Sequence, residues 1–403
     1  MNDAQAHRPM IGRLTRRGFL RRIALTGVSL AAVDALLAAC GGSSNTAPSA
    51  AATTVAATKA PATTGGSAPA AASTSAGVGS FKGQKLTVTS YGGTWQDFMT
   101  ASHIPDFEAQ TGAKVELAIG LAKDWFAKIR AAGKGDAPYD VVVMNETYCA
   151  QLRAEGFFGP LPQDKVANIK DVPQALRLQD DVGVLGLAGP LVIAYRTDLV
   201  KDPPQSWLDL GKYGGKTGIY TISNSAEPQH ILMMSKILGG DPKNWQVGFD
   251  WIAKNLCNAK QVDFSGTIQT QLTQGEVTVG ILDSPTGALM KKQGVPVEFI
   301  IPKEGAMGMF EQNMNVMVGS KQKELGYAFI NYWLSEPVQR KWAESFYYTP
   351  ANPNVVIGGD LAKLVPVSTK NIDVIPRWDY VWLNSGPRDQ MTDKWTRTVT
   401  GHC

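Results

Sequence analysis

The chain has 403 residues and a formal net charge of +4, and this excess charge is confined to residues 1–39. Six arginines and two aspartates in that segment account for it, so the rest of the chain carries 33 basic and 33 acidic residues. A neutral body without basic clusters excludes nucleic acid as an expected partner, because nucleic-acid binding relies on a positively charged surface.

Residues 1–39 are predicted to be an export signal rather than folded structure. A basic stretch, 13–22, is followed by an apolar run, 23–39, in the order typical of a signal peptide. Within the basic stretch, residues 15–21 (TRRGFLR) resemble the twin-arginine export motif. A plain N-terminal membrane anchor is the alternative. Asp34 interrupts the apolar run, which falls short of the roughly 20 apolar residues of a spanning helix.

A lipid anchor and a tether are expected next. Residues 37–41 (LAACG) resemble a bacterial lipobox, which implies cleavage before Cys40 and attachment of lipid to its sulfur. Residues 40–80 are rich in Ala, Thr, Ser, Gly and Pro, with Lys59 as the only charge, and are predicted to be a disordered tether. An unrelated low-complexity insert is the alternative. The protein is therefore expected to be exported and lipid-anchored at the outer face of the cell membrane or in the periplasm.

The remaining chain, about 320 residues long, exceeds what one compact core usually holds, so two lobes are expected. Cys149, Cys257 and Cys403 allow one disulfide and one free thiol, or three reduced thiols. Their spacing matches no zinc motif, and neither a metal nor a cofactor is expected.

Strands and helices alternate along this body. The first half is predicted to contain strands at 86–90, 114–119 and 140–144, and helices at 94–111, 123–132 and 147–155. The second half is predicted to contain strands at 191–195, 218–221, 277–282, 295–301 and 314–318, and helices at 228–238, 244–255 and 286–293. In the last expected helix, Leu325, Phe329 and Trp333 lie four apart on one face. This alternation predicts an α/β fold with mainly parallel sheets and ligand sites beyond the carboxyl ends of the strands.

No catalytic motif is recognisable in the body, which contains only three histidines: His103, His230 and His402. We therefore expect a binding protein rather than an enzyme. Two alternatives stay open, a tethered carbohydrate-active hydrolase that uses only carboxylates and a non-catalytic adhesion or scaffold lipoprotein.

Residues 85–354 resemble the periplasmic polyamine-binding (spermidine/putrescine) family of ABC-transporter receptors. The segments that carry the resemblance, in order and spacing, are 90–95 (SYGGTW), 139–143 (YDVVV) with 153–156 (RAEG), 206–210 (SWLDL), 274–280 (QGEVTVG), 302–305 (PKEG) and 330–334 (INYWL). The resemblance implies a type II-like periplasmic-binding-protein fold with a hinge between two α/β lobes. Lobe 1 would comprise 85–190 and 305–403, and lobe 2 would comprise 191–304.

The resemblance also implies a solute site in the cleft between the lobes. Tyr91 and Trp95 would sandwich the ligand, and their faces also attract an ammonium group. Asp283 ends a strand at a position where family members often carry an aromatic residue; it would pair with a cation, or it would cap the next helix. The other implied site residues are Asn145, Glu146 and Tyr148 after a buried strand, Phe310, Glu311 and Gln312 on the return crossing, and Tyr347 or Tyr348 at the rim. For the residues after the strand, capping of the next helix is the alternative.

One loop departs from the family pattern. The polyamine receptors carry several acids after an early strand of the second lobe, whereas residues 223–229 (SNSAEPQ) contain Glu227 as the only acid, beside Ser225. The ligand would then carry fewer amines, or Asp283 would take over their role. A small organic cation is the expected solute, with a neutral or anionic solute as the alternative. ABC permease subunits are the expected protein partners.

Overall fold

The computed structural model describes residues 80–399 except 264 and 309–311, and the side chain of Ser265 is also outside the description. The predicted twin-arginine motif, Cys40 and the tether therefore lie outside the described residues. No helix in the described part of the chain is long and apolar enough to cross a membrane.

Lobe 1 is built on a mixed sheet in the order β2-β1-β3-β13-β6-β5, with β4 also paired to β13. Strands β1 (Lys85–Ser90), β2 (Lys114–Ile119) and β3 (Val141–Met144) are parallel, and β13 (Asn313–Met317) runs antiparallel to β3. The short strands are β4 (Phe158–Gly159), β5 (Arg177–Leu178), β6 (Gly183–Leu185) and, in a separate pair, β7 (Leu187–Ala188) with β14 (Thr349–Pro350).

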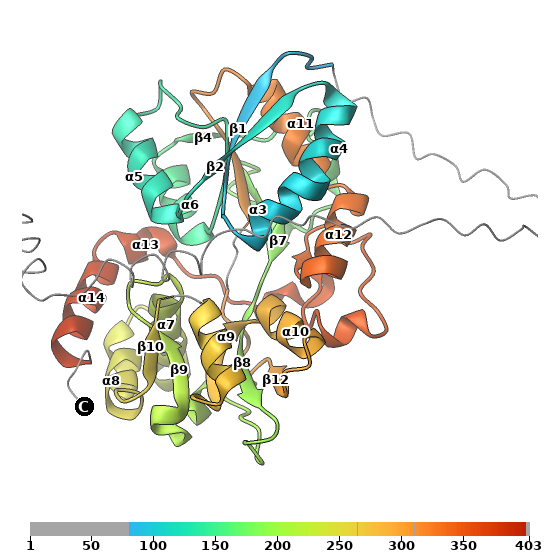
Figure 1. The fold of residues 1–403 in the computed structure, drawn as a ribbon. Coiled ribbons are helices and arrows are strands. Elements are labelled where there is room, and N and C mark those ends of the chain that lie inside the picture. The colour runs from blue at the N-terminus through green and yellow to red at the C-terminus, as the bar shows by residue number, and fades with distance from the viewer. Residues whose placement is uncertain (1–79, 264, 309–311, 400–403) are drawn as a thin grey trace, which may run out of the picture. The chain divides into compact units, whose positions relative to one another are not determined.

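Helices cover both faces of this sheet (Figure 1). They are α3 (Thr94–Phe98), α4 (Ile104–Thr111), α5 (Ala122–Ala132), α6 (Glu146–Ala154), α11 (Lys323–Trp333) and α12 (Glu336–Phe346). In β3, Val141 and Val143 pack in one apolar cluster, and Val142 and Met144 pack in another, as the alternation of a strand requires. The predicted face of α11 is confirmed, because Leu325, Phe329 and Trp333 are all buried.

The helix expected over 94–111 is interrupted by one turn of π-helix at Met99–His103. Pro105 lies at the start of α4 and has no backbone N–H, so the carbonyl one turn earlier loses its helical partner. A local π turn is one way in which a helix accommodates such a loss.

Lobe 2 repeats the arrangement of lobe 1. Its sheet has the order β10-β9-β11-β8-β12, in which β9 (Thr217–Tyr220), β10 (Lys260–Val262) and β11 (Val279–Asp283) are parallel. Strands β8 (Leu191–Arg196) and β12 (Val297–Ile300) complete it, with β8 antiparallel to both β11 and β12. Its helices are α7 (Ala226–Gly239), α8 (Trp245–Asn255), α9 (Ser265–Gln274) and α10 (Ser284–Lys292).

Two crossing segments connect the lobes. The first, 186–191, leads from β7 into β8, and the second leads from β12 back to β13. They pair where they cross, because Leu191 and Met307 donate backbone N–H groups to each other's carbonyl oxygens at 2.8 and 3.1 Å. Two adjacent extended segments between two lobes form a hinge.

The C-terminal segment adds a third crossing. Ile372 and Ile375 pack in the core of lobe 1, whereas Trp378, Met391 and Trp395 pack in the core of lobe 2. The expected division placed the whole of 305–403 in lobe 1, and the structure differs because these large apolar side chains are buried against the second sheet.

This third crossing lies directly against the second. Ala306 donates its N–H to the Val374 carbonyl at 3.1 Å. Gly305 has φ +100°, and a Cβ placed on it would lie 2.6 Å from the same oxygen. Only glycine fits this approach without strain, because it lacks the Cβ and tolerates positive φ.

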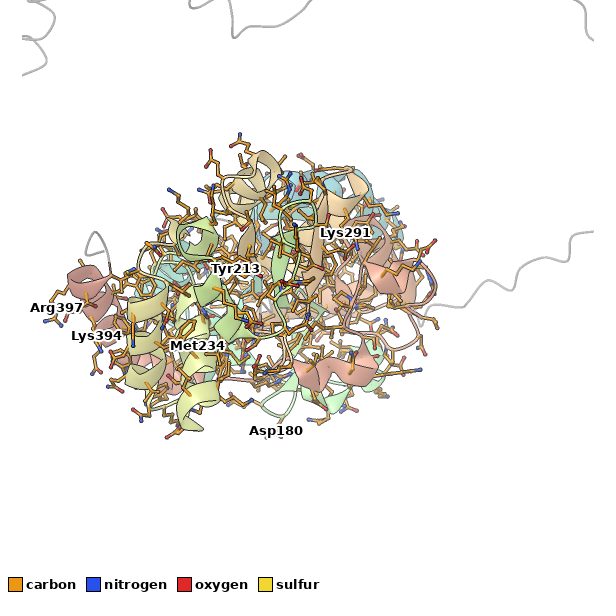
Figure 2. The ribbon with its side chains drawn as sticks, turned by 90° about the horizontal axis from the view of Figure 1, so that it is seen from below. Asp180, Tyr213, Met234, Lys291, Lys394 and Arg397 are labelled. Atoms are coloured by element: carbon orange, nitrogen blue, oxygen red, sulfur yellow. The ribbon has the colours of Figure 1, made fainter. Side chains whose placement is uncertain are left out.

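Helices α13 (Tyr380–Asn384) and α14 (Pro387–Thr398) fasten the C-terminal segment to both lobes. The Asn384 side-chain amide donates to the Thr147 carbonyl of α6 in lobe 1 at 2.6 Å. On lobe 2, Lys394 pairs with Asp250 of α8 at 2.5 Å. Figure 1 shows α13 next to α6, and Figure 2 shows Lys394 and Arg397 on α14 at one edge of the molecule.

The cysteines fit the first of their two expected states. Cys149 is a buried free thiol. Cys257 is disulfide-bonded.

Candidate functional site

A cavity of about 260 Å³ lies between the two lobes, at the carboxyl ends of β1 and β11. Lobe 1, lobe 2 and the hinge all contribute to its wall, through Tyr91, Thr94, Trp95, Gly189, Asp283, Pro285, Thr286, Leu289, Gln312, Phe346 and Tyr348. Five residues expected from the sequence are thereby brought together: Tyr91, Trp95, Asp283, Gln312 and Tyr348. The cavity is smaller than the roughly 300–1,000 Å³ of drug-sized ligand pockets, so its size suits a small solute.

The aromatic side of the cavity is fixed by packing. Trp95 stacks on the buried Trp342, with ring centroids 4.0 Å apart, and meets Tyr348 edge-on at 5.5 Å. Tyr91 packs against Trp125 at 5.3 Å. Gly189 lets the hinge approach this side, since a Cβ there would lie 2.9 Å from the Tyr348 ring. The result is a rigid apolar surface whose aromatic faces attract cations.

Asp283 is the last residue of β11 and has both roles that its sequence position allows. Its Oδ1 accepts a hydrogen bond from the Thr286 N–H at 2.9 Å and so caps α10. The same side chain lines the cavity although only 8% of the residue is exposed. No hydrogen bond to Oδ2 is found within the described residues. Asp283 is the one charged side chain among the described residues that line the cavity.

Gln312 lies on the second crossing immediately before β13. Its carbonyl accepts from the Gly186 N–H at 2.8 Å, which fixes the backbone. The side chain is fully buried, and neither Nε2 nor Oε1 has a hydrogen-bond partner among the described residues. A buried amide without partners is costly, by about 1–3 kcal/mol per unsatisfied group. This amide is therefore available to a ligand.

The three site residues expected after β3, which are Asn145, Glu146 and Tyr148, do not line the cavity. Glu146 is buried and forms an ion pair with Arg153, and its other oxygen accepts from the Asn313 side chain. Burial raises the pKa of Glu146, and the Arg153 charge opposes this shift. Tyr148 packs between Phe126, at 5.4 Å, and the Arg388 guanidinium, at 5.7 Å. Asn145 precedes α6 and does not line the cavity either.

The loop of residues 223–229 in lobe 2 does not line the cavity either. Ser225 precedes α7, and Glu227 is fully buried with its Oε1 3.0 Å from Nδ1 of His230. The loop is held by a residue that the sequence did not single out, Asp263, whose backbone carbonyl accepts from the Asn224 side chain at 2.7 Å. Neither expected residue of this loop lines the cavity.

The remaining expected positions lie elsewhere. Phe310, Glu311 and Cys40 are outside the described residues. His103 is buried away from the cavity, and burial lowers its pKa to about 4. Sequence reasoning missed Thr94, Gly189, Pro285, Thr286, Leu289 and Phe346. Four of these, Thr94, Pro285, Thr286 and Leu289, lie within three residues of an expected strand end or helix start. Their position could therefore have indicated them from the sequence.

The comparisons with known proteins agree with this architecture. Residues 103–366 match the family described as bacterial extracellular solute-binding protein. The spermidine/putrescine-binding periplasmic protein of Salmonella typhimurium is 24% identical over 275 residues, covering 66% of this chain and 78% of that protein. The gamma-aminobutyric acid-binding protein of Pseudomonas aeruginosa is 22% identical over 304 residues, covering 72% and 84%.

A solved structure shows the same fold. The crystal structure of an extracellular solute-binding protein from Bordetella parapertussis superposes with a TM-score of 0.68 at 23% identity, covering 79% of this chain and 99% of that one. The family match covers most of the described residues, and it agrees with the observed fold of two α/β lobes with a cavity between them. The chain belongs to the bacterial extracellular solute-binding protein family.

Proposed function

We propose that this protein is the solute receptor of an ABC importer and that it captures a small organic cation in the cavity between its lobes. The observation that carries the proposal is Asp283, a largely buried carboxylate that faces a cavity walled by Trp95 and Tyr348. A carboxylate pairs with an ammonium group, and the rings pack against the carbon chain.

Closure of the hinge brings the residues of the two lobes together around the solute. Asp283 and Leu289 belong to lobe 2, whereas Trp95 and Tyr348 belong to lobe 1, so a ligand contacts all four only when the lobes are closed. Ligand binding then stabilises the closed form through contacts that the open form lacks. The permease would receive the solute from this closed form.

A thermal-shift screen tests the solute class. The protein without residues 1–39 would be heated with putrescine, spermidine, small monoamines, amino acids, sugars and organic anions. A solute at 100 times its Kd stabilises the fold by about 2.7 kcal/mol, which shifts the melting temperature measurably. We expect cations alone to do so. Shifts by sugars or anions alone would contradict a cation receptor, and consumption of the solute during incubation would show an enzyme.

We also propose that lipid on Cys40 holds the receptor at the outer face of the membrane. The support is the order of basic stretch, apolar run and lipobox in the sequence. Cys40→Ser is expected to remove incorporation of labelled palmitate, measured on cells that express the full chain. Labelling of the variant at the wild-type level would contradict this anchor.

A further inference from the structure

We propose that the solute carries a single cationic nitrogen and, separated from it, a neutral group that both donates and accepts hydrogen bonds, such as a primary amide or a hydroxyl. This inference rests on the proposed function, because it specifies the ligand of the same cavity. It identifies Gln312 as the residue that selects such a solute over a diamine.

The described part of the cavity wall supplies one carboxylate. Among its described lining residues, Asp283 alone is charged. Of the other expected acids, Glu146 pairs with Arg153 and Glu227 with His230, and both are buried outside the cavity wall. The third, Glu311, lies outside the described residues. A second ammonium group would find no carboxylate among the described lining residues, and the loss of its hydration without such a partner is unfavourable.

The donor and acceptor inventory of Gln312 specifies the other end of the solute. Its Oε1 needs a donor and its Nε2 needs an acceptor, and both are buried without a partner among the described residues. An ammonium group carries donors only, so it satisfies Oε1 and leaves Nε2 unpaired. A carboxylate satisfies Nε2 alone. A primary amide or a hydroxyl satisfies both atoms.

The Asp283 carboxylate and the Gln312 amide lie in different lobes, so they bind different ends of the solute. Asp283 ends β11 in lobe 2, whereas Gln312 precedes β13 of lobe 1, with its backbone held by Gly186. A solute that contacts both therefore joins the lobes through an ionic contact on one side and a neutral hydrogen-bonded contact on the other.

Calorimetric titration with matched compounds tests this specificity. For chains of three to six carbons, the protein without residues 1–39 would be titrated with the diamine, the amino alcohol, the ω-amino amide and the plain alkylamine. At the best chain length we expect the amino amide or amino alcohol to bind at least tenfold more tightly than the alkylamine and the diamine. A diamine that binds more tightly than its amino amide would overturn the inference.

Two substitutions at Gln312 test its role directly. Gln312→Leu is expected to abolish the tenfold preference for the amide while leaving the melting temperature of the free protein unchanged or higher, because an unpaired amide is removed. Gln312→Glu adds a carboxylate and is expected to reverse the preference towards the diamine by at least tenfold. Gln84→Glu adds the same charge at an exposed site outside the cavity and serves as the control.

The outcomes separate this inference from the proposed function. A lower melting temperature of Gln312→Leu with an unchanged ranking of compounds would show a structural role for the amide and would overturn the inference alone. Binding of none of these compounds, together with no response to any cation in the thermal-shift screen, would overturn the inference and the cation receptor together.

Discussion

Asp283→Asn is expected to weaken the binding of every cationic solute by about 2–5 kcal/mol, which is the usual effect of truncating one partner of a buried charge pair. Asparagine has nearly the same shape and is as good a helix cap as aspartate, so its side-chain oxygen still accepts from the Thr286 N–H. The stability of the free protein should therefore change little. Affinity is measured by calorimetry and stability by urea unfolding.

Two further variants make this result interpretable. Asp283→Ala removes both the charge and the cap, so it should weaken binding similarly and also destabilise the free protein by about 0.5–2 kcal/mol. Asp263→Asn changes an exposed aspartate in lobe 2 that does not line the cavity, and affinity should stay at the wild-type value. Equal losses for Asp263→Asn and Asp283→Asn would show a long-range charge effect instead of direct pairing.

Arg153→Ala is expected to lower the free energy of unfolding by about 3–5 kcal/mol, because it removes the ion-pair partner of the buried Glu146 carboxylate and leaves it only the charge of Arg377. The matched control is Arg340→Ala, which breaks the half-exposed pair with Glu336 on α12. That pair should contribute no more than about 1 kcal/mol. Urea unfolding of both variants measures the difference.

The pH dependence of the Arg153→Ala effect follows from Glu146. Burial raises the pKa of this carboxyl in the folded protein, and removing Arg153 raises it further. A raised carboxyl pKa stabilises the fold at low pH, and this contribution is lost as pH rises through the folded-state pKa. The destabilisation by Arg153→Ala should therefore be larger at pH 8 than at pH 5. An effect that stays constant over this range would contradict a Glu146 that becomes charged in the absence of its ion-pair partner.

Most of the longer strands and helices of both lobes were predictable because their patterns are long enough to be recognised, whereas β10, α9 and α12 were not predicted. The buried run Val141–Met144 and the helical face of Leu325, Phe329 and Trp333 are examples, and both occur as predicted. The two- and three-residue strands between 158 and 188 were not predictable, since a period of two residues needs more than one repeat to be recognised. The course of the C-terminal segment also could not be predicted, because burial of Trp395 depends on a sheet formed by distant residues.

Residues of the candidate site were predictable where a strand end alone places them in the cavity. They were not predictable where contacts with distant residues decide the position of the side chain. Tyr91 and Asp283 line the cavity because they stand at the carboxyl ends of β1 and β11. Glu146 lies equally close to a strand end, but Arg153 of the same helix and Asn313 of a distant strand hold its carboxylate. Glu227 offered a local signal, since His230 lies three residues later on the same helix.

The course of the C-terminal segment places the two ends of the described chain where closure of the lobes would change the distance between them. Phe81, at the start of the described chain, packs on the core of lobe 1, and Val399, at its end, packs in the core of lobe 2. The two ends of the folded chain are therefore attached to different lobes. A donor dye at the exposed Lys82 and an acceptor dye at the exposed Arg397 would change their energy transfer as the solute brings the lobes together. Capture of the solute can thus be followed without labelling the cavity.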